Sequence, residues 1–476
     1  MRSLLPLCLL LVSCFGGGAA DSADSAVEVD SDTPAPVSAW RRWPTDDPRE
    51  VPTAPHVVLL IGCTWRADQL GPWGGRPDVA PTLSRLAAQG VVFERTIAQA
   101  PWTRPAAAAI LTGRYPDDLG ITEPSFGPNH RGLPASAHTL PERLHEAGWS
   151  TVAVVSNPNL SSLWGFDQGF DVYVEAFPEW TRTAGIETAD EVRSRGPAVV
   201  KHALAEVAAR PDRKRPVFLE VVLIDAHAPR RVSPEAQATF AEADLPDEVA
   251  RYRAGLNQAD LALKELVEGL PAAGIPLEET IFVLVGDHGE GLELPPSHGQ
   301  AHGFTLYPST THVPWVISGA GIGRGRIGGL STQLDLAPTV LGLLGLGKVG
   351  LVGEDLSVAV KAGQGSAVRD TAYTSTRLRW ADRSAAITAD MHCQIDHDDK
   401  ATAQSISKGR GLEFSTGCCR ILEDPACDRP EWDPGLLERL RGWRSDRQQA
   451  HTAAEAQTAE PNEVLRMQLR ALGYAE

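Results

Sequence analysis

The sequence predicts an α/β fold: a largely parallel central sheet flanked by helices, followed by a smaller C-terminal α+β domain. Strand and helix signals alternate from residue 55 onward, which is typical of parallel sheets. The first strand signal, at residues 57–61, is an unbroken run of apolar and β-branched residues, as expected for a strand that is buried on both faces. A Gly- and Val-rich break at residues 345–365 separates this pattern from shorter elements. A chain of 476 residues has room for both domains.

The first 50 residues are expected to serve export and anchoring. Arg2 precedes a short apolar run at residues 4–12, which is too short to span a bilayer. The run ends in Leu-Val-Ser-Cys, which resembles a bacterial lipobox and implies that Cys14 is lipidated. We therefore expect a signal peptide at residues 1–13 and a disordered tether at residues 14–50, which is rich in Gly, Ala, Ser, Asp and Pro. The expected location is the bacterial cell envelope, on the membrane; the alternative is an ordinary cleavage site with a chance Cys.

The elements of the first domain, residues 51–350, follow in regular order. Each strand is short and apolar, and the first helix has Pro near its start and Gly90 after its end. The expected strands are at 57–61, 150–155, 217–223, 280–285 and 313–318, and the expected helices at 80–89, 140–147, 252–270 and 334–344.

Polar residues stand immediately after three of these strands. They are Cys63, the pair Asp225 and His227, and the pair Asp287 and His288. In open parallel sheets the functional loops lie beyond the carboxyl ends of the strands. The pattern therefore predicts that these side chains converge at one rim of the sheet.

The smaller domain, residues 365–476, is expected to contain short strands at 371–376 and 385–393 and a helix at 434–445. Residues 447–462 are polar and are expected to be loose, before a last short helix at 463–472.

Four cysteines cluster in this domain, at positions 393, 418, 419 and 427. Export implies an oxidising compartment, where an even set would form two disulfides. Because neighbouring cysteines rarely pair, Cys418 and Cys419 would each take one of the other two. A zinc site is the alternative, although the cluster has no Cys-x-x-Cys pair.

The formal net charge of −17 makes nucleic acid an unexpected partner. An acidic average does not exclude a local pocket that accepts an anion.

Several segments together resemble the sulfatase family of the alkaline phosphatase superfamily. The opening strand leads into Cys63 where the family normally has Asp, and residues 101–114 have the frame of the family's active-site signature. Further similar segments are Ser-Asn-Pro-Asn at 156–159, Asp-Ala-His-Ala-Pro at 225–229, Gly-Asp-His-Gly-Glu at 286–290, His-Gly at 298–299 and 302–303, and Asp-Leu-Ala-Pro-Thr at 335–339. The resemblance implies an alkaline-phosphatase-like fold.

The resemblance also implies that Thr103 stands where active members oxidise Cys or Ser to formylglycine. Thr cannot form that aldehyde, but its hydroxyl would serve as a nucleophile if a metal lowered its pKa. Ala107 replaces the Arg or His that holds the nucleophile. His227 and His302 are the other catalytic candidates. Arg104, expected at the surface or rim, and Arg114 are the candidates for substrate binding.

A divalent metal, Ca²⁺ or Mg²⁺, is also implied by the resemblance, with Asp287 and His288 as ligands. Cys63 lacks the carboxylate that a hard cation needs, and its thiol suits zinc better. The alternatives are therefore a zinc site of Cys63, Asp287 and His288, or no metal.

These observations favour a family member that has lost sulfate-ester hydrolysis but keeps an anion-binding cleft made positive by its histidines. Its expected partner is a sulfated or phosphorylated small molecule or glycan. The alternative is an active metal-dependent hydrolase or transferase of sulfate or phosphate esters that uses Thr103.

Overall fold

The computed structural model describes residues 38–39, 43–44, 47–121, 130–177, 196–292, 302–347, 350–378, 381–397, 416–424, 427, 429, 431–453, 457–459 and 461–472. The expected signal peptide, Cys14 and most of the tether lie outside the described residues, as does the His-Gly pair at 298–299. In the part of the chain that is described, no helix is both long and apolar enough to cross a bilayer.

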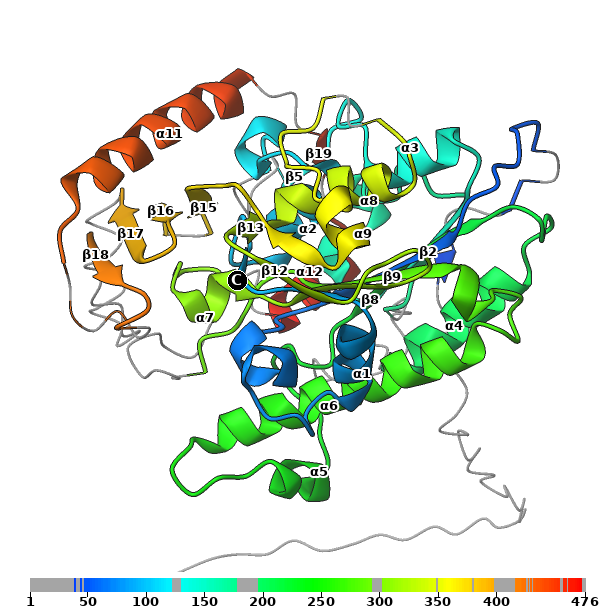
Figure 1. Ribbon diagram of the computed structural model, residues 1–476, viewed down its shortest axis with the longest axis horizontal. Coiled ribbons are helices and arrows are strands. Elements are labelled where there is room, and N and C mark those ends of the chain that lie inside the picture. Colours follow the sequence, from blue (N-terminus) through cyan, green and yellow to red (C-terminus); the bar gives the residue numbers. More distant parts are fainter. Residues whose placement is uncertain are drawn as a thin grey trace, which may run out of the picture. The chain divides into compact units, whose positions relative to one another are not determined.

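The main element is a ten-stranded sheet, which confirms the predicted α/β class (Figure 1). Its central strands β6, β8, β2 and β9 are parallel, and β11 is antiparallel to both of its neighbours. In sheet order the strands are β1 Ser38–Ala39, β7 Val172–Glu175, β6 Ser150–Val155, β8 Val217–Leu223, β2 His56–Gly62, β9 Thr280–Gly286, β11 Trp315–Gly319, β3 Val91–Phe93, β12 Gly325–Gly328 and β14 Gln364–Ser366.

Helices cover both faces of this sheet, as Figure 1 shows. Alternate residues of β2 divide between two cores: Leu59 packs with the helices of one face and Leu60 with those of the other. One face carries α1 Pro81–Gln89, α4 Gly196–Ala208 and α6 Asp247–Gly269. The other carries α2 Thr103–Thr112, α3 Leu140–Glu146, α8 Leu336–Leu343, α9 Ser357–Ala362 and α12 Glu463–Ala471.

A separate antiparallel sheet forms the C-terminal part, in the order β15-β16-β17-β18, with α11 Pro434–Ala453 packed on one face. Its strands are β15 Ala372–Thr376, β16 Arg383–Ile387, β17 Met391–Asp396 and β18 Gly417–Arg420.

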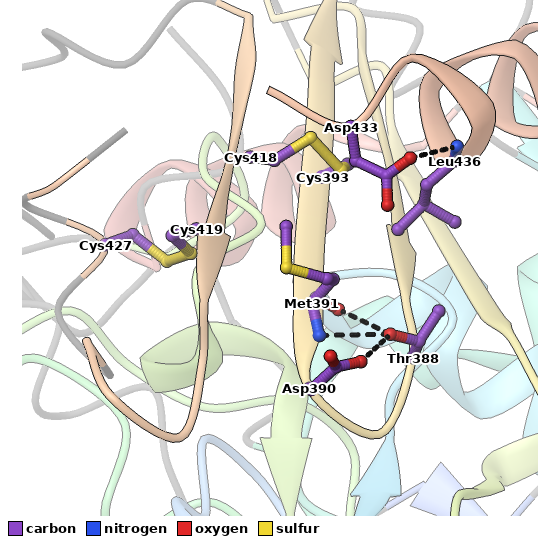
Figure 2. Close-up of a disulfide and its surroundings, with 9 residues drawn as sticks. All are labelled: Thr388, Asp390, Met391, Cys393, Cys418, Cys419, Cys427, Asp433 and Leu436. Carbon is purple, nitrogen blue, oxygen red and sulfur yellow. Dashed lines mark hydrogen bonds between the residues drawn. A yellow bond between two sulfur atoms is a disulfide. The ribbon is translucent and has the colours of Figure 1, made fainter. Parts of the chain in front are cut away.

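Two predictions for this part were wrong. Residues 385–393 are not one strand but a hairpin, because the Thr388 hydroxyl bonds Asp390 and the backbone of Met391 and stabilises a turn (Figure 2). The segment 447–462 is not loose throughout, since α11 extends to Ala453 and β19 Gln457–Ala459 pairs with β5 His130–Gly132.

The cysteine cluster forms two disulfides, Cys393–Cys418 and Cys419–Cys427, as Figure 2 shows. This confirms the expectation that the neighbouring cysteines pair with the other two, and it overturns the zinc alternative. The first bond joins β17 to β18 at directly opposed positions.

Candidate functional site

Thr103 opens helix α2, and its hydroxyl lies at the centre of a buried polar cluster. The residue before it is extended and the helix ends at Gly113, whose positive φ of 58° suits glycine. The Thr103 side chain is 0% exposed. Its Oγ1 is 3.3 Å from His288 Nε2 and accepts a bond from Asn157 Nδ2 at 3.1 Å.

Asn157 links Thr103 to Cys63. It follows β6, and its Oδ1 accepts from the Asn159 backbone N–H at 3.0 Å. Its Nδ2 therefore faces the cluster, where it is 3.4 Å from Cys63 Sγ at the end of β2. The elements α2, β6 and β2 thus bring polar residues to one rim, and among these three residues the strand pattern had predicted Cys63.

Asp287 follows β9 at the same rim and is fully buried. Its Oδ1 accepts from the backbone N–H groups of Thr64 at 2.9 Å and His288 at 2.6 Å. Thr64 adopts a φ of 60° to do so, a conformation that is strained for a β-branched residue. Asp287 Oδ2 is buried without a hydrogen-bond partner, 3.5 Å from His288 Nε2.

His288 is a neutral acceptor. Burial lowers its pKa to about 4, against the opposing effect of Asp287. Its Nδ1 donates to the Gly289 carbonyl at 2.8 Å, so Nε2 carries no proton and accepts from the Thr103 hydroxyl. The expectation that His288 adds positive charge to an anion site was therefore wrong.

His227 and His302 lie beside His288. The His302 ring centroid is 4.8 Å from that of His227 and 4.5 Å from that of His288. His302 Nδ1 is 3.0 Å from Glu290 Oε1. Burial by itself would raise the pKa of Glu290, but His302, together with the 2.9 Å ion pair to Arg230, lowers it to about 2. Glu290 is therefore an ionised partner that orients His302.

The two candidate substrate-binding arginines, Arg104 and Arg114, do not lie on an exposed rim beside Thr103. Arg104 is 2% exposed, lies 3.9 Å over the Trp164 ring and donates to Asn159 Oδ1, so the surface or rim position expected for it was wrong. Arg114 follows the far end of α2, about 15 Å along the helix axis from Thr103, and donates to the Asp118 carbonyl. The structure does not bring Arg114 to Thr103.

Asn157 was missing from the predicted site residues, although it contacts both Cys63 and Thr103. The signal was available, because Asn157 follows its strand closely, as Cys63 and Asp287 follow theirs. Ala107 lies in the apolar core of the same face.

The residues present do not fit a hard cation. The unsatisfied Asp287 Oδ2 would suit one. Among the described residues of the cluster, however, the other carboxylate is Glu290, which His302 and Arg230 occupy. Asn157 presents its amide NH₂, and Cys63 a thiol, where Ca²⁺ or Mg²⁺ needs several oxygens. Over the described ranges, no group of three or more His, Cys, Asp or Glu side chains is placed to hold a metal. The zinc set of Cys63, Asp287 and His288 is not preformed either.

Comparison with known proteins identifies relatives of this chain. The Sulfatase family model matches residues 55–346. An ulvan-active sulfatase of Formosa agariphila is 25% identical over 67% of each chain, and an N-acetylgalactosamine-6-sulfatase of Rattus norvegicus is 25% identical over 62% of this chain and 63% of its own. The chain thus spans about two thirds of the length of these relatives.

Solved structures show the same fold. One protein, solved with its substrate D-glucosamine-2-N,6-O-disulfate, superposes with a TM-score of 0.64 at 15% identity, over 85% of this chain and 99% of its own. A protein of the alkaline phosphatase superfamily from Vibrio parahaemolyticus superposes with a TM-score of 0.57 at 18% identity, over 85% and 88%.

Proposed function

The chain belongs to the sulfatase family, and from this premise we propose that it binds a sulfated or phosphorylated glycan or small molecule without hydrolysing sulfate esters. The family generally uses a divalent metal. We propose that this member has lost tight Ca²⁺ or Mg²⁺ binding, and with it the family's reaction.

The observation that carries this proposal is the run of hydrogen bonds from Cys63 through Asn157 and Thr103 to His288. In this run of bonds, the Cys63 thiol stands where the family normally has an Asp carboxylate. The Thr103 hydroxyl stands where active members have the Cys or Ser that becomes formylglycine. Transition-state stabilisation depends on charged groups aimed at the reacting centre, and here His288 is neutral. Among the described residues, His227 and His302 would contact an anion by donating hydrogen bonds.

The sulfated ligand is supported by the relatives, which are a sulfatase active on ulvan and one named for N-acetylgalactosamine 6-sulfate. We expect purified protein to release no sulfate from 4-nitrophenyl sulfate, with or without Ca²⁺. It should bind a sulfated glucosamine more tightly than its desulfated form by calorimetry, and His302→Gln should weaken that preference. Efficient sulfate release, or equal binding of the two sugars, would contradict the proposal.

A second function is favoured by the Thr103–His288 contact. The Asn157 amide donates to Thr103 Oγ1, so the hydroxyl proton is directed at His288 Nε2, as in a nucleophile paired with its base. Against it, an imidazole with a pKa of about 4 is a weak base. The test is hydrolysis of 4-nitrophenyl phosphate with added zinc. Turnover that persists in Thr103→Ser and disappears in Thr103→Ala would establish this alternative in place of the first.

Export and lipid anchoring through Cys14 remain proposals as well. Expressed in a bacterium, the protein should partition with membranes, and Cys14→Ser should leave the signal uncut or release the protein. A Cys14→Ser variant that is processed and stays membrane-bound would refute the anchor.

A further inference from the structure

The chain immediately after His302 is held by the C-terminal sheet. Thr376, the last residue of β15, donates its hydroxyl to the Gly303 carbonyl at 2.6 Å. Arg383, the first residue of β16, donates through Nη1 to the Phe304 carbonyl at 2.7 Å. Two consecutive carbonyls of the site's chain are therefore bound by side chains more than 70 positions away.

Both donors are themselves fixed. Arg383 places Nε and Nη2 on one oxygen of Asp396, at 3.0 and 2.9 Å, and both side chains are 2% exposed. The Thr376 hydroxyl also accepts from the Leu378 N–H at 3.3 Å. Charge-assisted bonds in a buried environment are strong and orienting, so the sheet offers a rigid support.

The backbone at Gly303 fits this support closely. Its φ of 88° favours glycine, and the space where a Cβ would stand is filled by Leu378, whose Cδ2 is 2.2 Å from that point. Leu378 thus packs directly on the segment that Thr376 and Arg383 hold.

From these contacts we infer that Thr376 and Arg383 are positioning residues for His302, and that the C-terminal sheet is a working part of the site. Glu290, which follows β9, holds the His302 ring through the 3.0 Å contact between Oε1 and Nδ1. Thr376 and Arg383 hold the backbone that follows His302 through the carbonyls of residues 303 and 304. The positioning of His302 is independent of the proposed function; only the role of His302 in contacting the ligand rests on it.

The test measures His302 directly. Diethyl pyrocarbonate modification is followed by mass spectrometry, with His138, whose side chain is 45% exposed, as the internal reference. Thr376→Val keeps the shape and removes the hydroxyl. We expect it to raise the modification rate of His302 about five-fold, from the loss of one hydrogen bond. Thr376→Ser keeps the hydroxyl and should have the modification rate of the parent. Arg383→Lys cannot bind Asp396 and the Phe304 carbonyl with separate nitrogens, and it should also raise the His302 rate.

The matched control is Ser375→Ala, because Ser375 is the neighbour on β15 and donates instead to Asp117 Oδ2 at 3.1 Å. It should leave the His302 rate unchanged. If Thr376→Val matches this control, the inference is wrong, and the Thr376 series decides this even if Arg383→Lys fails to fold. Sulfate release by the unmodified protein would defeat the proposed function but not this inference, since the probe needs no ligand.

Discussion

The buried charges of the C-terminal sheet and of the site rim differ in how completely they are paired. In the sheet, Asp396 receives two bonds from Arg383, and the remaining Arg383 donor reaches the Phe304 carbonyl. At the rim, Asp287 is equally buried, but its Oδ2 has no hydrogen bond. A satisfied pair is typical of a structural role, whereas a buried oxygen without a hydrogen-bond partner calls for a separate explanation. Equal burial of two carboxylates therefore does not mean that they are equally well paired.

The largest expected effect comes from breaking the complete pair. Asp396→Ala leaves Arg383 buried and uncompensated, which should lower the free energy of unfolding by about 3–5 kcal/mol. Replacing both residues, Arg383→Met with Asp396→Leu, should recover most of the loss. Urea unfolding followed by fluorescence measures both. A single variant within about 1 kcal/mol of the parent would show that the pair is not desolvated as described.

A third buried carboxyl group, that of Glu220, has no ion-pair partner among the described residues. Glu220 lies inside β8 with one oxygen unpartnered, and burial raises its pKa to about 8. Because the folded pKa exceeds the unfolded one of 4.5, Glu220 costs nothing below that value, and stability falls as the pH rises from 4.5 to 8. Glu220→Gln should therefore stabilise the protein by about 3 kcal/mol at pH 7 and hardly at all at pH 4.

Thermal unfolding of the parent and Glu220→Gln across pH 4–9 checks this. Equal pH dependence of the two proteins would show that Glu220 does not titrate in the folded core.

The smallest expected effect comes from completing the rim. Cys63→Asp adds a second carboxylate near Asp287, and Ca²⁺ at ten times a weak dissociation constant should then stabilise the variant by about 1.4 kcal/mol. The parent should show no Ca²⁺ shift. Cys63→Asn is the uncharged control, and Asp287→Asn in the Cys63→Asp background should abolish the gain. A Ca²⁺ shift in the parent would mean that its cation site is complete.

Much of the fold was predictable because its signals are local. The strands at 150–155 and 217–223 coincide with β6 and β8, since short segments dominated by apolar and β-branched residues are typical of strands buried in a parallel sheet. The C-terminal hairpin was missed because its turn depends on the Thr388 hydroxyl within an otherwise strand-like run. The length of α11 was missed because its exposed polar residues resemble a loop.

The sequence alone was enough to predict that Cys63, Asp287 and His288 meet at the rim, because each follows a strand and parallel strands end at one edge. The sequence analysis did not predict that Asn157 joins them. It also excluded a bond between the neighbouring Cys418 and Cys419, whereas the structure decided which of the two remaining pairings forms. Only the tertiary structure decided that His288 is neutral and that Arg104 is stacked on Trp164, since both depend on burial by distant segments. The hold of Thr376 on Gly303 is of the same kind, because no local pattern marks a hydrogen bond across 73 positions.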